Sequence, residues 1–203
     1  MRRLLLIAFL AAMCLGLGLV LSYGIEDSKP KPVPPQSPEI WKDPQSGLTW
    51  QVSPNPKQKV HLMMDWRLAE RFCKRLKLGG QRHWRLPTIT ELRSLIRDCP
   101  ATQTGGSCGV TDICLKFKKC RDVTCGGCSK KGGPGSGGSY WPPELSGEIG
   151  RYWSSSTVWD ASTGFEKWTV NFDNGDIGMG ELGYSNVGVS AIAYFAYVRC
   201  VHQ

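Results

Sequence analysis

The sequence has few histidines and, after its first 21 residues, no long apolar run. The three histidines in 203 residues are His61, His83 and His202, too scattered to indicate a serine–histidine–aspartate triad. The lack of a second apolar run excludes a protein with several membrane helices. Acidic residues are also in the minority, with 17 Asp and Glu against 25 Lys and Arg and a formal net charge of +8. Such a charge favours anionic partners, although it serves solubility equally well.

The N-terminus predicts export. Arg2 and Arg3 precede an uncharged apolar run at residues 4–21, which is the pattern of a signal peptide. The run is also long enough to cross a membrane once, so residues 1–24 are either a cleaved signal or a retained anchor. A lipid on Cys14 is a third reading. In each case the rest of the chain is exported, to the cell envelope or outside the cell, with residues 4–21 as its membrane contact if they stay uncleaved.

Composition divides the exported part into segments. Residues 25–40 contain five prolines, which is typical of a stiff, extended linker. A single domain is expected to follow at residues 41–203. Within it, residues 99–150 form an insertion rich in Cys, Gly, Lys and Ser, where no helical or strand period persists. Because the insertion has little apolar content, we expect it to need covalent staples in order to fold.

Eight cysteines lie in the exported part, and an oxidising compartment favours their pairing into four disulfides. Six of them belong to the insertion: Cys99, Cys108, Cys114, Cys120, Cys125 and Cys128. Their spacing does not determine which cysteine pairs with which. If these six pair among themselves, Cys73 and Cys200 are left to bridge a predicted helix and the last predicted strand.

Three interpretations compete for the Cys125-Gly-Gly-Cys128 motif: a structural zinc site, a redox dithiol and cysteines in separate disulfides or one shared disulfide framework. A structural zinc site needs four ligands in paired knuckles, but the insertion has no histidine and no second close pair of cysteines. A redox dithiol needs a thiolate at a helix N-terminus, and no helix is predicted around these residues. Disulfides are therefore predicted, and no metal or cofactor is expected.

Two amphipathic helices are predicted. The first lies within residues 63–80, where Asp65 can cap its start and Gly79-Gly80 would end it. The second follows Pro87. Its opening sequence, Thr88 to Glu91, is a capping box, in which each of these two side chains accepts the other's backbone N–H.

Strands dominate the rest of the expected domain. They are predicted within residues 46–52, 151–159, 166–172, 176–182 and 193–201. Asp173-Asn174-Gly175-Asp176 separates two of them and predicts a hairpin with a type I′ turn, because Asn-Gly tolerates positive φ angles.

Six blocks of the sequence, in this order, resemble the conserved blocks of the Lcl C-terminal domain family. The blocks are DPQSGLTWQ (43–51), WRLAERFCKRLKLGG (66–80), HWRLPTITELRSLI (83–96), YWSSS (152–156), WTVNFDNGDIG (168–178) and YVRCV (197–201). The resemblance covers residues 41–98 and 150–201. The insertion departs from the family pattern, in which this connection is shorter and poor in cysteine.

The resemblance implies a fold and a setting. The fold is α+β and C-type-lectin-like, related to that of sulfatase-modifying proteins, with two helices packed on small twisted antiparallel sheets. The resemblance also implies N- and C-terminal strands that lie close together, and a Cys73–Cys200 bridge. The family consists of exported bacterial domains of largely unknown function and is named after a collagen-like adhesin, whose collagen repeats are absent here.

The candidate binding residues are Trp159 and one basic cluster. The cluster consists of Lys116, Lys118, Lys119, Arg121, Lys130 and Lys131. It can contact a polyanion or simply form a solvated surface. Trp159 and Trp141 can stack on a sugar ring, although most of the tryptophans are expected in the core.

A calcium site of the kind found in some lectins has candidate ligands. They are Asp160, Asp173, Asn174 and Asp176. Ordinary turn chemistry explains the last three equally well.

The leading functional hypothesis is an exported, non-catalytic binding module with a role in adhesion. Its expected partner is an acidic glycan, another polyanion or an envelope protein, and no specific binding of nucleic acid is predicted. The alternative is a thiol-dependent enzyme like the sulfatase-modifying proteins, which oxidise a cysteine with a pair of active-site cysteines. No matching pair stands out, because the surplus cysteines lie in the insertion, away from Arg85-Leu-Pro-Thr88.

Overall fold

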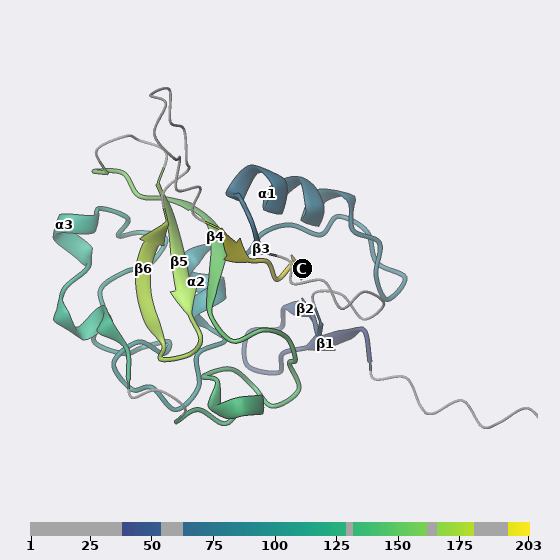
Figure 1. The fold of residues 1–203 in the computed structure, drawn as a ribbon, viewed down its shortest axis with the longest axis horizontal. Coiled ribbons are helices and arrows are strands. Elements are labelled where there is room, and N and C mark those ends of the chain that lie inside the picture. The colour runs from purple at the N-terminus through teal and green to yellow at the C-terminus, as the bar shows by residue number, and fades with distance from the viewer. Residues whose placement is uncertain (1–37, 54–62, 129–131, 162–165, 181–194) are drawn as a thin grey trace, which may run out of the picture. The chain divides into compact units, whose positions relative to one another are not determined.

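A computed structural model describes residues 38–53, 63–128, 132–161, 166–180 and 195–203 (Figure 1). The chain divides into two units, Met1–Gln36 and Ser37–Gln203, and all the described residues belong to the second. The expected signal or anchor and most of the expected linker lie outside the described residues. Within the described ranges, no helix is both long and apolar enough to span a membrane.

In the described part of the chain, eight short strands form two sheets. The strands are β1 (Ile40–Lys42), β2 (Thr49–Gln51), β3 (Met63–Met64), β4 (Arg151–Thr157), β5 (Lys167–Asn171), β6 (Asp176–Gly180), β7 (Ala196–Tyr197) and β8 (Val201–His202). The smaller sheet has the order β1-β2-β8, and the larger has the order β3-β7-β4-β5-β6. The pairing of β2 with β8, at Thr49 and His202, brings the N-terminal and C-terminal strands of the domain into the same small sheet.

The sequence predicts one strand within residues 193–201, but the structure divides this C-terminal segment into two strands. It contributes β7 to the larger sheet and β8 to the smaller, and β7 runs parallel to β4 at Tyr152 and Tyr197. The expectation of purely antiparallel sheets is therefore wrong. The break between β7 and β8 has a physical cause, since Arg199 and Cys200 are fully buried and are bound to groups outside the larger sheet.

Helix α1 (Trp66–Arg75) is shorter than the sequence predicted. Its start is as expected, because the Asp65 carboxylate accepts a hydrogen bond from the backbone N–H of Leu68 at 2.9 Å. The helix ends before Gly79-Gly80. These glycines instead form a tight turn with positive φ angles, closed by backbone hydrogen bonds between Leu78 and Gln81. The residues before Asp65 form strand β3 instead of a first helical turn.

Helix α2 (Ile89–Arg93) begins with the predicted capping box. Thr88 Oγ1 accepts from the N–H of Glu91 at 3.2 Å, and the Glu91 carboxylate accepts from the N–H of Thr88 at 2.8 Å. Both oxygens of Glu91 also accept from the guanidinium of Arg85, at 2.6 and 2.7 Å. The capping box is therefore confirmed. Arg85, which lies in the strand-like segment before α2, adds a bidentate ion pair that holds the Glu91 carboxylate in place.

The β5–β6 hairpin has a longer loop than predicted. Asn171 pairs with Asp176, so four residues connect the strands, and the N–H of Gly175 donates to the carbonyl of Asn171 at 2.7 Å. Gly175 takes a φ of +73°, whereas Asn174 does not adopt a positive φ. The predicted type I′ turn is therefore wrong, because that turn requires positive φ at both central residues.

Four disulfides staple the domain. They join Cys73 to Cys200, Cys99 to Cys128, Cys108 to Cys125, and Cys114 to Cys120. The six cysteines of the insertion thus pair among themselves, and α1 is tied to the segment before β8. The insertion also contains three short helical turns, where no helix was predicted: α3 (Phe117–Cys120), η1 (Val123–Gly126) and η2 (Ser136–Gly138).

The insertion packs on the β5–β6 hairpin through its Cys-Gly-Gly-Cys stretch. The N–H of Cys128 donates to the carbonyl of Asn174 at 2.6 Å. Gly127 has a φ of +83°, and a Cβ at this position would lie 2.2 Å from the same carbonyl oxygen. Only glycine fits a backbone that passes so close to the hairpin in this conformation.

Two hydrophobic cores lie inside the described unit. The larger lies between α2, strands β4 to β6 and the insertion, and the smaller lies beneath α1 around the Cys73–Cys200 bridge. Five tryptophans are almost fully buried in these cores: Trp50, Trp84, Trp141, Trp153 and Trp168. Since residues 37–203 contain both cores and all four disulfides, this part of the chain is a complete folding unit.

Candidate binding surfaces

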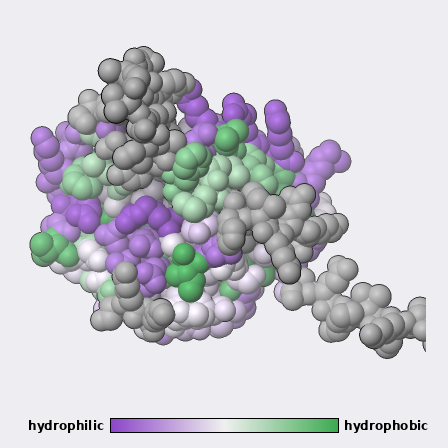
Figure 2. Space-filling view, in the orientation of Figure 1, coloured by the Kyte–Doolittle hydropathy of each residue, from purple (hydrophilic) through white to green (hydrophobic). Residues whose placement is uncertain are grey.

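The first candidate surface lies on the insertion around α3. We define the α3 surface as the exposed side chains Lys116, Lys118, Lys119 and Trp159. The Cys114–Cys120 disulfide encloses the three lysines in a short loop. Trp159 follows β4 and is 63% exposed, so its indole ring is open to a ligand. The side of the molecule that carries α3 is mostly hydrophilic in the space-filling view (Figure 2).

Backbone contacts bring Trp159 and the lysines together. The N–H of Trp159 donates to the carbonyl of Leu115 at 3.1 Å. The carboxylate of the next residue, Asp160, accepts from the N–H groups of Phe117 and Lys118. Although burial acts to raise the pKa of Asp160, these hydrogen bonds act against it and the pKa falls below its usual value. Asp160 therefore caps the first turn of α3 as an anion and joins it to the end of β4.

Arg121, another member of the predicted basic cluster, is used to anchor α3. Its guanidinium donates to Asp176 Oδ1 at 3.1 Å and to the carbonyl of Ile177 at 2.9 Å. It also lies 5.4 Å from the centre of the Phe117 ring. These contacts fix α3 against β6, so the guanidinium is not presented to a ligand in the way that the three lysines are. Lys130 and Lys131 lie outside the described residues.

Two of the other sequence-predicted ligands, Asn174 and Asp176, have structural roles. Asp176 pairs with Arg151 at 2.6 Å as well as with Arg121, and Asn174 Oδ1 accepts from the N–H of Asp176. The described part of the chain contains no cluster of three or more His, Cys, Asp or Glu that could hold a metal ion. Trp141 is fully buried, so the expectation that it could stack on a sugar is wrong.

A second cationic surface, which the sequence reasoning missed, lies along α1. We define the α1 face as the exposed side chains Arg71, Lys74, Arg75, Lys77 and Arg82 together with the apolar residues Met64, Leu68, Phe72 and Leu76. Glu70 is the one acidic residue between positions 66 and 83, and it pairs with Lys74 at 3.0 Å. The signal was present in the sequence, because positions 71, 74 and 75 share one side of a helix.

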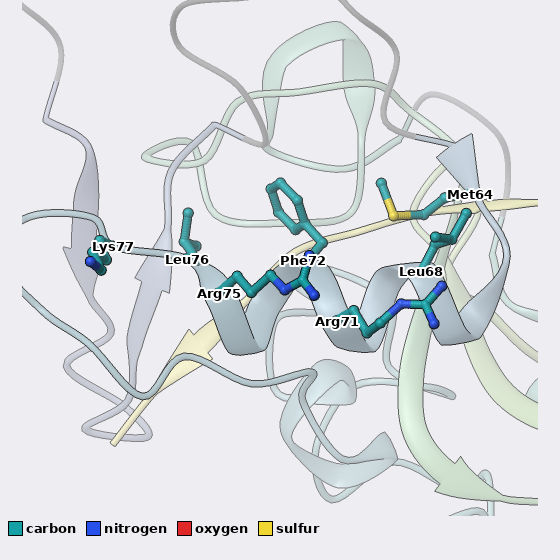
Figure 3. Close-up of a pocket in the computed structure, with 7 residues that line it drawn as sticks. All are labelled: Met64, Leu68, Arg71, Phe72, Arg75, Leu76 and Lys77. Carbon is teal, nitrogen blue, oxygen red and sulfur yellow. The ribbon is translucent and has the colours of Figure 1, made fainter.

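Two adjoining hollows lie on the α1 face. The first has a volume of about 490 Å³, and the described residues that line it are Met64, Leu68, Arg71, Phe72, Arg75, Leu76 and Lys77. The second has a volume of about 430 Å³ and is lined by Lys74, Arg75, Leu76, Lys77, Arg82 and His83. Figure 3 shows Phe72 and Leu76 on one side of α1, with the guanidinium groups of Arg71 and Arg75 in front of the helix.

The two surfaces are separate. Figure 1 shows α3 at the left edge of the molecule and α1 near the top centre of the view, with β4, β5 and β6 between them. In Figure 2 a hydrophobic area over α1 is bordered by hydrophilic side chains that project outward. Substitutions in one surface can therefore serve as controls for the other.

None of the cysteines in the described part of the chain offers a free thiol. All eight cysteines from Cys73 to Cys200 are in disulfides. A thiol-dependent enzyme would have to open one of these bridges before it could act.

Comparison with known proteins agrees with the sequence blocks. The sequence model of the Lcl C-terminal domain family matches residues 39–202. This range runs from β1 to β8 and includes the whole insertion. No curated protein and no solved structure matches the chain. The matched range covers the entire described unit except for its first and last residues. The chain belongs to the Lcl C-terminal domain family.

Proposed function

We propose that this protein is an exported, non-catalytic binding module that attaches to acidic glycans through the α3 surface. The observation that carries the proposal is an exposed tryptophan beside three exposed lysines on a disulfide-enclosed turn. An attachment of this kind would serve adhesion.

The chemistry of the α3 surface suits a charged sugar. A sugar ring can stack on the indole of Trp159, because the ring offers apolar C–H groups to the aromatic face. Lysine ammonium groups are compact charges on flexible stems, so they can follow the sulfates or carboxylates of a polymer whose charges are not evenly placed. The backbone under these side chains is held by Asp160 and by the Cys114–Cys120 bridge, which lowers the entropic cost of binding.

Two further features support an extracytoplasmic location and a C-type-lectin-like architecture. Four disulfides in a domain of this size are typical of an oxidising, extracytoplasmic compartment. The pairing of β2 with the last strand, β8, and the disulfide that ties α1 to the C-terminal segment support a C-type-lectin-like architecture. The protein is therefore proposed to act at the cell envelope or outside the cell.

Retention of residues 37–203 on immobilised heparin tests the proposal. The variant Lys116→Gln/Lys118→Gln/Lys119→Gln should elute at clearly lower salt than the parent, since it loses three charges at the proposed site. Trp159→Ala should weaken binding of a sulfated oligosaccharide without changing how steeply that binding falls with salt.

The matched control is Arg71→Gln/Arg75→Gln/Lys77→Gln, which removes the same charge from the α1 face. The control should elute close to the parent. Equal losses for both triple variants would mean that net charge alone causes retention, and the α3 site would be rejected.

A further inference from the structure

The α1 face combines cations with four apolar side chains along one helix and the strand before it. The five cationic side chains of the α1 face lie on α1 and in the segment that follows it. Between them Leu68 is 45% exposed, and Phe72 and Leu76 are half-buried. A surface helix with a cationic border, an exposed leucine and a partly exposed phenylalanine is typical of a segment that lies in a membrane interface.

The two hollows divide these properties between them. Met64, Leu68, Phe72 and Leu76 give the first hollow an apolar lining. Lys74, Arg82 and His83 give the second a polar, cationic lining. Arg75, Leu76 and Lys77 line both, so the hollows adjoin. A ligand that matches both hollows has an apolar part and an anionic part close to each other.

We propose that the α1 face binds anionic phospholipid at a bilayer surface. The apolar side chains would enter the boundary between head groups and acyl chains, while the guanidinium and ammonium groups pair with lipid phosphates. A hydrophilic polyanion would use the cations but would gain nothing from Leu68 and Phe72. The amphipathic pairing of the hollows therefore favours a lipid over a glycan at this face.

The path of the chain is consistent with an α1 face that lies against a membrane. The Glu39 carboxylate accepts from the N–H of Gly79 at 3.3 Å, and the Ile40 side chain lies against the same glycine. The chain thus enters the domain beside the turn that follows α1. An N-terminal anchor at residues 4–21, as the sequence predicts if this run stays uncleaved, would therefore join the domain at the end of α1.

Sedimentation with lipid vesicles tests the proposal on residues 37–203, which lack the apolar N-terminal run. The vesicles are phosphatidylcholine alone and a 7:3 mixture of phosphatidylcholine and phosphatidylglycerol, at 0.1 M salt. The protein should bind the mixed vesicles much more tightly than the neutral ones. Arg71→Gln/Arg75→Gln/Lys77→Gln should weaken binding to the mixed vesicles by about 100-fold, at roughly fivefold for each cation.

Two further variants separate the proposal from its rivals. Lys116→Gln/Lys118→Gln/Lys119→Gln has the same net charge as the α1 variant and should keep most of the vesicle binding. Leu68→Gln should weaken binding about tenfold with no change in charge, because exposed Leu68 would no longer enter the bilayer. All variants should keep the elution volume and near-ultraviolet circular dichroism of the parent.

Three outcomes would overturn the proposal. Equal losses for the two triple variants would assign the binding to net charge. Unchanged binding by Leu68→Gln would mean that no apolar contact with the bilayer exists. Loss of heparin retention in the α1 triple variant, with vesicle binding intact, would assign the α1 face to a polyanion.

Discussion

Arg199 and Tyr152 show how single buried polar residues organise this small domain. The Arg199 guanidinium donates to the carbonyls of Gln51 and Val52, both at 2.7 Å, and to that of Ser146 at 2.8 Å. It also lies 5.5 Å from the centre of the Tyr152 ring. Burial lowers the pKa of Arg199 from its usual value, and nearby Tyr152 acts in the opposite direction. One side chain thus connects the last segment of the chain to β2 and to the segment before β4.

Tyr152 should make the free energy of unfolding of the domain fall at alkaline pH. Burial raises its pKa to about 12, and its hydroxyl donates to the carbonyl of Glu148 at 2.7 Å. In the unfolded chain a tyrosine has a pKa near 10, so between pH 10 and 12 the unfolded state loses a proton that the folded state keeps. The free energy of unfolding should be unaffected below about pH 10 and should fall by roughly 2 kcal/mol by pH 12.

Denaturant unfolding at a series of pH values checks this expectation. Tyr152→Phe is the control, because it removes the ionisable hydroxyl and should flatten the alkaline part of the profile by about the same amount. An identical alkaline slope in the two proteins would contradict the role of Tyr152.

At the scale of residues, the sequence indicated which side chains are chemically suited to bind a ligand. It did not indicate which of them are exposed. Trp159 and Trp141 looked equally able to stack on a sugar, yet one is 63% exposed and the other is fully buried. Arg121 looked equivalent to the neighbouring lysines, yet it pairs with Asp176, which is 55 positions away. Burial and ion pairing of this kind depend on contacts between distant segments, which no local pattern encodes.

Elements were predictable where their signals are local. The capping box of α2 and the Asp65 cap of α1 each depend on residues within one turn of helix, and both were predicted. The end of α1 was wrong because a glycine pair fits a tight turn as well as a helix end. The hairpin turn was wrong because loop length depends on strand register, which is not visible in the dipeptide Asn-Gly.

The first part of the insertion is organised by one arginine of α2. Arg93 is 3% exposed, and its guanidinium donates to four backbone carbonyls. These belong to Thr102, Gln103, Gly106 and Val110, at distances of 2.6 to 3.2 Å. Since these carbonyls come from an irregular segment, Arg93 replaces the hydrogen bonds that a helix or sheet would have provided.

Arg93→Met should therefore destabilise the domain by about 3 kcal/mol or more, because buried carbonyls would lose a charged donor. Guanidinium chloride unfolding measures the change, and Arg71→Met, at an exposed position of α1, should stay within about 0.5 kcal/mol of the parent. Arg93→Lys should recover only part of the loss, because an ammonium group cannot span four carbonyls. Similar stabilities of Arg93→Met and Arg71→Met would contradict this account.

The whole molecule is closed by the disulfide between Cys73 and Cys200. These cysteines are 127 positions apart, whereas Cys114 and Cys120 are 6 apart. A disulfide restricts the unfolded chain more strongly when it closes a longer loop. In the chain-entropy model the two bridges stabilise the fold by about 5 and about 2 kcal/mol, respectively.

Removing each bridge by paired Cys→Ser substitutions tests this difference. Loss of Cys73–Cys200 should lower the free energy of unfolding by roughly twice as much as loss of Cys114–Cys120. Thermal or denaturant unfolding of the two double variants gives the comparison. A larger loss for the short bridge would show that local packing, and not loop closure, determines how much each disulfide contributes.

At this largest scale, the order of the sequence blocks indicated the family and an α+β domain, both of which are confirmed. The division of the strands between two sheets was not predictable. It depends on the C-terminal segment, which leaves one sheet at Tyr197 and joins the other at Val201. The cationic side of α1 is visible in the sequence, but its two hollows are not, because they form only when β3 and the turn after α1 are in place.

The turn around α3 has a consequence for how this protein can diversify. Its backbone path is held by the Cys114–Cys120 bridge and by the bonds of Asp160 to backbone N–H groups. Neither depends on the side chains of Lys116, Lys118 or Lys119. Other residues can replace these three without altering the frame, as happens in the variable loops of antibodies. A new ligand preference can therefore arise, or be engineered, at these positions at almost no cost in stability.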